Sequence, residues 1–224
     1  MTPRLSPARQ HRDALLILPG LGYGRDEGKA FRGIAAAAAA DGIDVYVPGY
    51  LTRDGLDASR EKLRRYIATQ RLDRYERLHV FAFIAGAWAV NPLLERDSLP
   101  NLTTVVYDRS PLQERAPAIA ARRLPVLAWL RYGSTIFDLA RVPYPPLAQP
   151  RVRVALLVET RPTSFIRRHE KDAALGTVAF DCDALRQRYD ACAYVPMSHD
   201  EIYTRFAEVW PEVRSFIATG RLSR

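Results

Sequence analysis

Six short runs of Val, Ile, Leu, Phe and Tyr recur along the chain, separated by stretches in which apolar residues return with helical spacing. Short, almost wholly apolar runs are typical of strands in a parallel sheet that is covered on both faces. The predicted strands are 14–18, 44–47, 78–84, 102–107, 152–159 and 191–195.

Helical patterns fill most of the intervals between these runs, and the predicted helices are 30–40, 57–70, 85–95 and 201–220. Strands that alternate with helices indicate βαβ units and right-handed crossovers. The sequence therefore predicts an α/β fold with a mostly parallel, doubly wound sheet of about six strands and helices on both faces.

The interval 109–150 breaks the alternation, because it contains seven prolines and no clear strand. An interval of this length is too long for a plain connection. We expect a lid, or cap, inserted over the carboxyl edge of the sheet, within a single domain that spans residues 1–224.

Composition narrows the picture. A chain of 224 residues that is 48% hydrophobic can bury the core of one such domain. The net charge of +8 comes from basic residues scattered along the whole chain, without the aromatic and basic motif of a nucleic-acid module. We expect no nucleic-acid partner.

The first apolar run is too short for a signal peptide or a membrane span. Cys182, Cys192 and the four histidines show no metal-ligand spacing. The sequence predicts a cytoplasmic protein with no metal, no cofactor and no structural disulfide.

The stretch 77–95 passes from strand to helix without a loop, as a nucleophile elbow does. The elbow pattern G-x-S-x-G falls on residues 82–86, which places Ile84 where the reactive serine would be. Positions 78–90 contain no Ser, Thr, Cys, Asp or Glu, so no shift of register supplies a nucleophile. Covalent catalysis needs an activated nucleophile, and a hydrocarbon side chain cannot act as one.

From about residue 14 to residue 219 the chain resembles the α/β-hydrolase family, particularly its small lipases and esterases. "LLILPGLGYG" is similar to the family's first strand and glycine loop, with Pro19 in place of the usual histidine. The resemblance implies that the backbone amides of Leu21 and Ala85 form an oxyanion hole, and that Gly20 and Gly22 let a substrate approach the backbone.

The resemblance also places a catalytic histidine and its acid. "CAYVPMSHDEIY" is similar to the last strand and histidine loop of the family, so His199 falls at the general base. The acid normally follows the next-to-last strand, where this chain has Arg161 and Pro162, and Glu159 falls two residues too early. Some lipases carry the acid one strand earlier, at the position of Asp108.

Two arrangements of these residues stay open. In one, His199 and Asp108 form a hydrogen-bonded dyad beside the oxyanion site. In the other, Asp108 closes its own turn and His199 turns to solvent or to Asp200. Three departures from the family pattern, at the elbow, the first loop and the usual acid position, favour the second arrangement.

The function that we infer from the sequence is therefore non-hydrolytic. We expect a small apolar or amphipathic ligand under the lid, bound beside Ile84, Trp88 and Trp129, or else a protein partner. An alternative is a nucleophile-free lyase, cyclase or cofactor-free oxygenase that uses His199 and Asp108 for proton transfer. A third is an esterase that attacks with Ser110 or Ser198.

Overall fold

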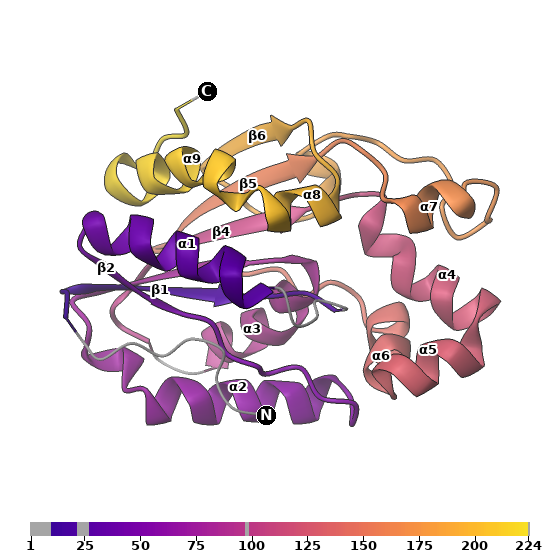
Figure 1. Ribbon diagram of the computed structural model, residues 1–224, viewed down its shortest axis with the longest axis horizontal. Coiled ribbons are helices and arrows are strands. Elements are labelled where there is room, and N and C mark those ends of the chain that lie inside the picture. The colour runs from indigo at the N-terminus through magenta and orange to yellow at the C-terminus, as the bar shows by residue number, and fades with distance from the viewer. Residues whose placement is uncertain (1–9, 22–26, 97–98, 224) are drawn as a thin grey trace.

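The computed structural model describes residues 10–21, 27–96 and 99–223, with the backbone alone for 27–33. Its centre is a six-stranded sheet in which every neighbouring pair of strands is parallel, in the order β2-β1-β3-β4-β5-β6 (Figure 1). The strands are β1 (Asp13–Leu18), β2 (Ile43–Tyr46), β3 (Arg77–Ala82), β4 (Leu102–Arg109), β5 (Arg153–Glu159) and β6 (Ala191–Val195). The predicted fold class is confirmed.

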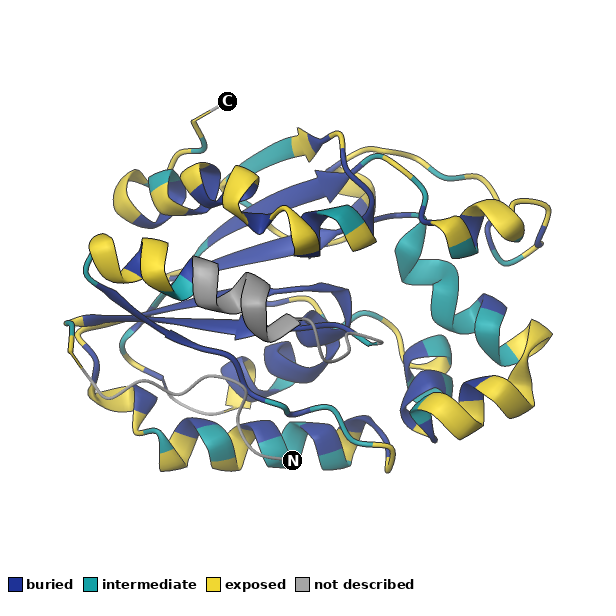
Figure 2. Cartoon of the chain, viewed as in Figure 1, coloured by how far each residue is buried: buried dark blue, intermediate teal, exposed yellow. Residues whose placement is uncertain are grey.

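Alternation along each strand divides the core into two hydrophobic clusters, one on each face of the sheet. In β1, Leu16 and Leu18 belong to one cluster, and Leu15 and Ile17 belong to the other. The first cluster lies under α2 (Leu56–Thr69) and α3 (Ile84–Arg96), and the second under α1 (Glu27–Ala40), α8 (His199–Thr204) and α9 (Phe206–Thr219). Figure 2 shows the central strands of the sheet buried between these helices, whereas β6 at the edge is partly exposed.

The strand predicted at 78–84 ends two residues early, because β3 stops at Ala82 and α3 already starts at Ile84. Among the described residues, the only side chains at positive φ outside glycine belong to Arg71 and Arg186. Ile84 therefore does not have the left-handed backbone expected at a strained elbow, and the turn has relaxed around its β-branched side chain.

Gly86 permits the close approach of α3 to the sheet. A Cβ atom at this position would lie 2.6 Å from the backbone oxygen of Leu18, which is closer than atoms can pack without a shift of backbone. The glycine of the elbow pattern is thus retained for packing, although the nucleophile is absent.

We expect Gly86→Ala to lower the free energy of unfolding by about 1–3 kcal/mol, the usual cost of overpacking a core. Alanine is otherwise about 1 kcal/mol more favourable than glycine in a helix, so a net loss at Gly86 in α3 reports the close approach to Leu18. Denaturant unfolding measures it. Unchanged or increased stability of Gly86→Ala would contradict the proposed steric role of Gly86.

The interval 109–150 forms three short helices beside the carboxyl ends of the strands (Figure 1). These are α4 (Ala116–Arg123), α5 (Pro125–Tyr132) and α6 (Thr135–Arg141). Pro117 and Pro125 stand in the first turns of α4 and α5, where a missing backbone N–H costs nothing. Proline content that argues against strands therefore marks helix starts here.

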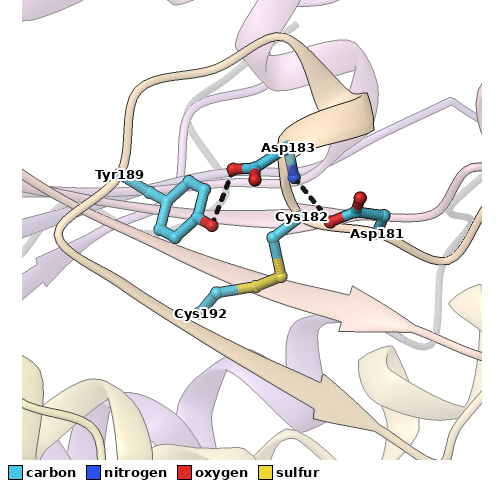
Figure 3. Close-up of a disulfide and its surroundings, with 5 residues drawn as sticks. All are labelled: Asp181, Cys182, Asp183, Tyr189 and Cys192. Atoms are coloured by element: carbon cyan, nitrogen blue, oxygen red, sulfur yellow. Dashed lines mark hydrogen bonds between the residues drawn. A yellow bond between two sulfur atoms is a disulfide. The ribbon is translucent and has the colours of Figure 1, made fainter.

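The segment between β5 and β6 carries a disulfide that the sequence did not predict. Cys182 lies just before a 3-10 turn (Asp183–Leu185) and is bonded to Cys192 in β6 (Figure 3). Beside it, the Tyr189 hydroxyl donates a hydrogen bond to Asp183. The expectation of no structural disulfide was wrong, because two cysteines with no motif reveal their pairing only once the fold brings them together.

No helix in the described part of the chain combines the length and the apolar character needed to cross a bilayer.

Candidate active site

A cavity of about 430 Å³ opens at the carboxyl ends of the strands, where ligands bind in open α/β sheets. Its walls come from the loop after β1, the start of α3, the helices α4–α6 and the loops after β5 and β6. The residues that line it are Gly20, Leu21, Ile84, Ala85, Trp88, Gln113, Glu114, Ala116, Pro117, Ala120, Arg131, Tyr132, Ile136, Leu139, Thr163, Ser164, Phe165, His199 and Asp200.

Two hydrogen bonds hold the first loop at the edge of this cavity. The N–H of Gly20 donates to the Tyr203 hydroxyl at 2.8 Å, and the Tyr50 hydroxyl donates to the carbonyl of Pro19 at 2.6 Å. The next residue, Leu21, borders the cavity together with Ile84 and Ala85.

Ala85 lies in the first turn of α3, where a backbone N–H has no acceptor within its own helix. The amides expected to form an oxyanion hole, those of Leu21 and Ala85, thus belong to residues that line one cavity. The side chain of Ile84, which also lines the cavity, is 7% exposed.

His199 is positioned by the start of α8. Ser198 caps this helix through a reciprocal pair of hydrogen bonds, in which Glu201 N–H donates to the Ser198 hydroxyl and Ser198 N–H donates to the Glu201 carboxylate. The imidazole also meets the edges of Phe83 and Tyr203, at centroid distances of 5.9 and 6.1 Å.

The imidazole faces Asp108. His199 Nδ1 lies 3.2 Å from Asp108 Oδ2, and both side chains are buried. The arrangement that the sequence favoured, with His199 turned away from Asp108, is therefore wrong. Asp108 lies in β4 and His199 in α8, so the departures from the family pattern in the elbow and in the first loop do not affect their contact.

A second carboxylate shares the same nitrogen. Glu159 Oε1 accepts a hydrogen bond from His199 Nδ1 at 3.1 Å, although its sequence position had excluded it as the acid. Asp108 pairs with Leu157 in the β4–β5 register, and Glu159 stands two residues beyond Leu157. Side chains two residues apart share a face, so the parallel register brings both acids to His199.

These three buried groups shift one another's protonation. Burial lowers the pKa of His199, but the charges of Glu159 and Asp108 and their hydrogen bonds outweigh it and raise that pKa to about 10. Burial, and then the charge of Asp108, raises the pKa of Glu159 well above its usual value. The two carboxylates therefore favour a proton on His199, and burial together with Asp108 favours a proton on Glu159.

The same three side chains are close enough to share a metal ion, since their ligand atoms lie within 4.8 Å of one another. The absence of a metal stays a prediction.

The other predicted residues divide between the cavity and the surface. Trp88 lines the cavity, and its indole N–H donates to the carbonyl of Val142. Trp129 is 54% exposed on α5 and lies under Arg53 rather than in the cavity wall, which corrects its expected place beside the ligand. Gly22 falls outside the described residues.

The two serines proposed as alternative nucleophiles have structural roles in the described fold. Ser110 Oγ accepts a hydrogen bond from the N–H of Gln113, and Ser198 caps α8. Neither residue lines the cavity.

Several polar lining residues carry no sequence signal that marks them as part of a site. Gln113 and Glu114 follow β4, and Thr163 and Ser164 begin α7 (Ser164–Arg168) after β5. The buried Arg109 donates to Glu114 and lies 3.7 Å from the Tyr144 ring centroid. Gln113, Glu114, Thr163 and Ser164 thus add polar groups to a cavity that is also lined by the apolar Ile84.

No protein-family model matches the chain, and no curated protein matches it in sequence. Solved structures do match its fold. AbyA5 is similar with a TM-score of 0.56 at 18% identity over 94% of this chain, which spans 64% of AbyA5. The type II thioesterase BorB from the borrelidin biosynthetic cluster has a TM-score of 0.55 at 16% identity, over 97% of this chain and 95% of BorB.

An esterase of Pyrococcus furiosus, PF2001, has a TM-score of 0.56 at 15% identity, over 93% of this chain and 82% of the esterase. At these identities the likeness concerns the fold alone. Together with the sheet order and the site, it shows that the chain has the α/β-hydrolase fold shared by esterases and thioesterases.

Proposed function

We propose that this protein is a nucleophile-free enzyme of the α/β-hydrolase fold, in which His199 moves a proton to and from a carbonyl ligand. One observation carries the proposal: Glu159 is hydrogen-bonded to His199 Nδ1 and Asp108 lies 3.2 Å from the same nitrogen, while the imidazole borders a cavity that Ile84 also lines. Burying a carboxylate costs free energy unless the carboxylate is paired. A triad that had lost its function would not be expected to retain two buried carboxylates beside the imidazole.

The chemistry uses the parts of the site that survive without a nucleophile. Neutral His199 accepts a proton from the carbon next to the carbonyl, and the resulting enolate oxygen lies by the amides of Leu21 and Ala85. Asp108 and Glu159 stabilise the imidazolium that forms and fix the orientation of the ring. Return of the proton to another carbon completes an isomerisation. If the enolate carbon attacks a second carbonyl of the ligand, the proton goes to the new alkoxide and a ring closes, and if a β-hydroxyl departs, the proton leaves with it as water in an elimination.

The ligand class follows from the walls of the cavity. Ile84, Trp88 and Leu139 offer an apolar surface, whereas Gln113 and Glu114 offer polar groups. We propose a small amphipathic ligand, covered by α4–α6 acting as a lid. A pure binding protein of the same shape would need neither acid at His199.

The proposed location is cytoplasmic. It now rests on the short first apolar run alone, because the disulfide removes the argument from unpaired cysteines: disulfides are rare in reducing compartments. The redox state of Cys182 and Cys192 in the native cell would test this location.

We expect the purified protein to leave p-nitrophenyl esters of every chain length unhydrolysed above buffer and to remain unlabelled by a fluorophosphonate probe. The reason is that Ile84, which lines the cavity, has a hydrocarbon side chain at the position where the family pattern carries its serine. Stoichiometric labelling of Ser164, which lines the cavity, or of Ser110 or Ser198, would show a serine hydrolase instead.

We expect Ile84→Ser to fold, with a loss of about 2 kcal/mol or less, because the side chain stands at the cavity wall and its removal exposes no closed void. The new hydroxyl should react with the fluorophosphonate probe above pH 9, where neutral His199 becomes available. The control variant Ile84→Val should stay unlabelled, and Ile84→Ser with His199→Gln should lose the reaction. Insoluble protein from Ile84→Ser alone would place Ile84 in the core rather than at the site.

A further inference from the structure

Helix α5 exposes almost its entire apolar surface. Val126, Leu127, Trp129 and Leu130 are 68%, 62%, 54% and 55% exposed, and we call these four residues the α5 patch. Ala128 is the one residue of this helix that is buried. In Figure 1 the helix lies at one end of the molecule, away from the sheet, and Figure 2 shows its exposed surface.

A contiguous apolar surface of this kind on a described face of the molecule indicates a binding site rather than chance exposure. The helix α5 contacts the rest of the fold mainly through its short neighbours α4 and α6. These contacts do not cover the α5 patch, so its apolar side chains remain exposed to water.

The stretch of chain that carries the patch is positively charged. Residues 115–137 contain four arginines and no Asp or Glu. Arg122 and Arg123 both contact Asp172, which leaves one positive charge in excess, and Arg53 lies over the Trp129 ring at 5.7 Å. The whole chain carries a net charge of +8.

We propose that the α5 patch inserts into the interfacial layer of a membrane that contains anionic lipids. An apolar helix face with Trp and Leu, bordered by arginines, lies in the plane of such an interface and does not cross it. Trp129 suits the headgroup level, where its ring is apolar and its N–H remains hydrated. The arginines contact lipid phosphates, which gives the binding its dependence on anionic lipid.

The same helix supplies Arg131 and Tyr132 to the cavity wall. Membrane binding through the α5 patch therefore brings the cavity next to the lipid surface. The proposal does not depend on the chemistry at His199, and it holds for a protein that only binds a ligand.

Sedimentation with lipid vesicles tests the proposal. We expect the full chain to bind vesicles of phosphatidylcholine and phosphatidylglycerol at least tenfold more tightly than vesicles of phosphatidylcholine alone, with weaker binding at higher salt. Leu127→Ser combined with Leu130→Ser should reduce the binding at least tenfold. Tyr194→Ser is the matched control, because Tyr194 is equally exposed, at 50%, on β6.

Tryptophan fluorescence tests whether the α5 patch itself contacts the lipid. Trp88 and Trp210 are 6% and 7% exposed, so Trp129 is the one tryptophan that can change its surroundings at the surface. We expect a blue shift on adding anionic vesicles and quenching by brominated lipid, both lost in Trp129→Phe.

Two results would overturn the proposal. The first is equal binding of the full chain and the Leu127→Ser, Leu130→Ser variant to anionic vesicles. The second is a dimer in sedimentation equilibrium that this variant abolishes, without any vesicle binding, which would make a second copy of the chain the occupant of the α5 patch.

Discussion

Replacing both acids beside His199, by Asp108→Asn together with Glu159→Gln, should lower the pKa of His199 from about 10 to below 6.5. Burial alone then acts on the imidazole, and burial favours its neutral form. A shift of more than three pKa units corresponds to more than about 4 kcal/mol. Titration of the imidazole by NMR measures it.

His79 is the internal reference for this experiment, because burial lowers its pKa to about 4 and it lies in β3, apart from both acids. Glu159→Gln alone should move the pKa of His199 in the same direction by a smaller amount, since Asp108 remains. A His199 pKa that stays unchanged in the double variant would show that the two acids do not set its charge.

His199→Ala should lower the free energy of unfolding by about 3–5 kcal/mol at pH 6, the usual cost of removing one partner from a buried ion pair. Asp108 and Glu159 then remain buried without a cation beside them. Adding Glu159→Gln should restore part of the lost stability, because only one buried carboxyl group then remains without the imidazole. Denaturant unfolding of the single and double variants measures both effects.

The free energy of unfolding lost in His199→Ala should decrease as the pH rises. The pKa of His199 in the folded protein, about 10, lies above its usual value of 6.5, so its protonation stabilises the fold fully below pH 6.5. This contribution fades as the pH rises toward 10. A destabilisation by His199→Ala that is larger at pH 10 than at pH 6 would contradict the account.

The pattern of apolar residues was sufficient to predict the sheet. Each of the six predicted strands overlaps an observed one, because strands buried on both faces need unbroken apolar runs. The apolar pattern could not predict where β3 ends, because Phe83 and Ile84 are equally compatible with a strand and with the start of a buried helix. Tertiary packing of Gly86 against Leu18 decides that point.

The site was only partly predictable. His199 and Asp108 follow from the resemblance to the α/β-hydrolase family, but the contact of Glu159 with His199 depends on the register between β4 and β5, which no local pattern specifies. The exposure of Trp129 depends on how α5 packs, and a tryptophan in an apolar run suggests a buried wall just as readily. The disulfide likewise depends on the path of the loop before β6.

The most direct test of the proposed proton transfer is hydrogen exchange on a ligand that cannot be hydrolysed. Medium-chain methyl ketones would be incubated with the protein in D₂O, and loss of the proton next to the carbonyl would be followed by NMR. We predict exchange that rises with pH until about pH 10, where His199 becomes neutral, and that disappears in His199→Gln. Equal exchange with the wild-type protein and with His199→Gln would contradict the account.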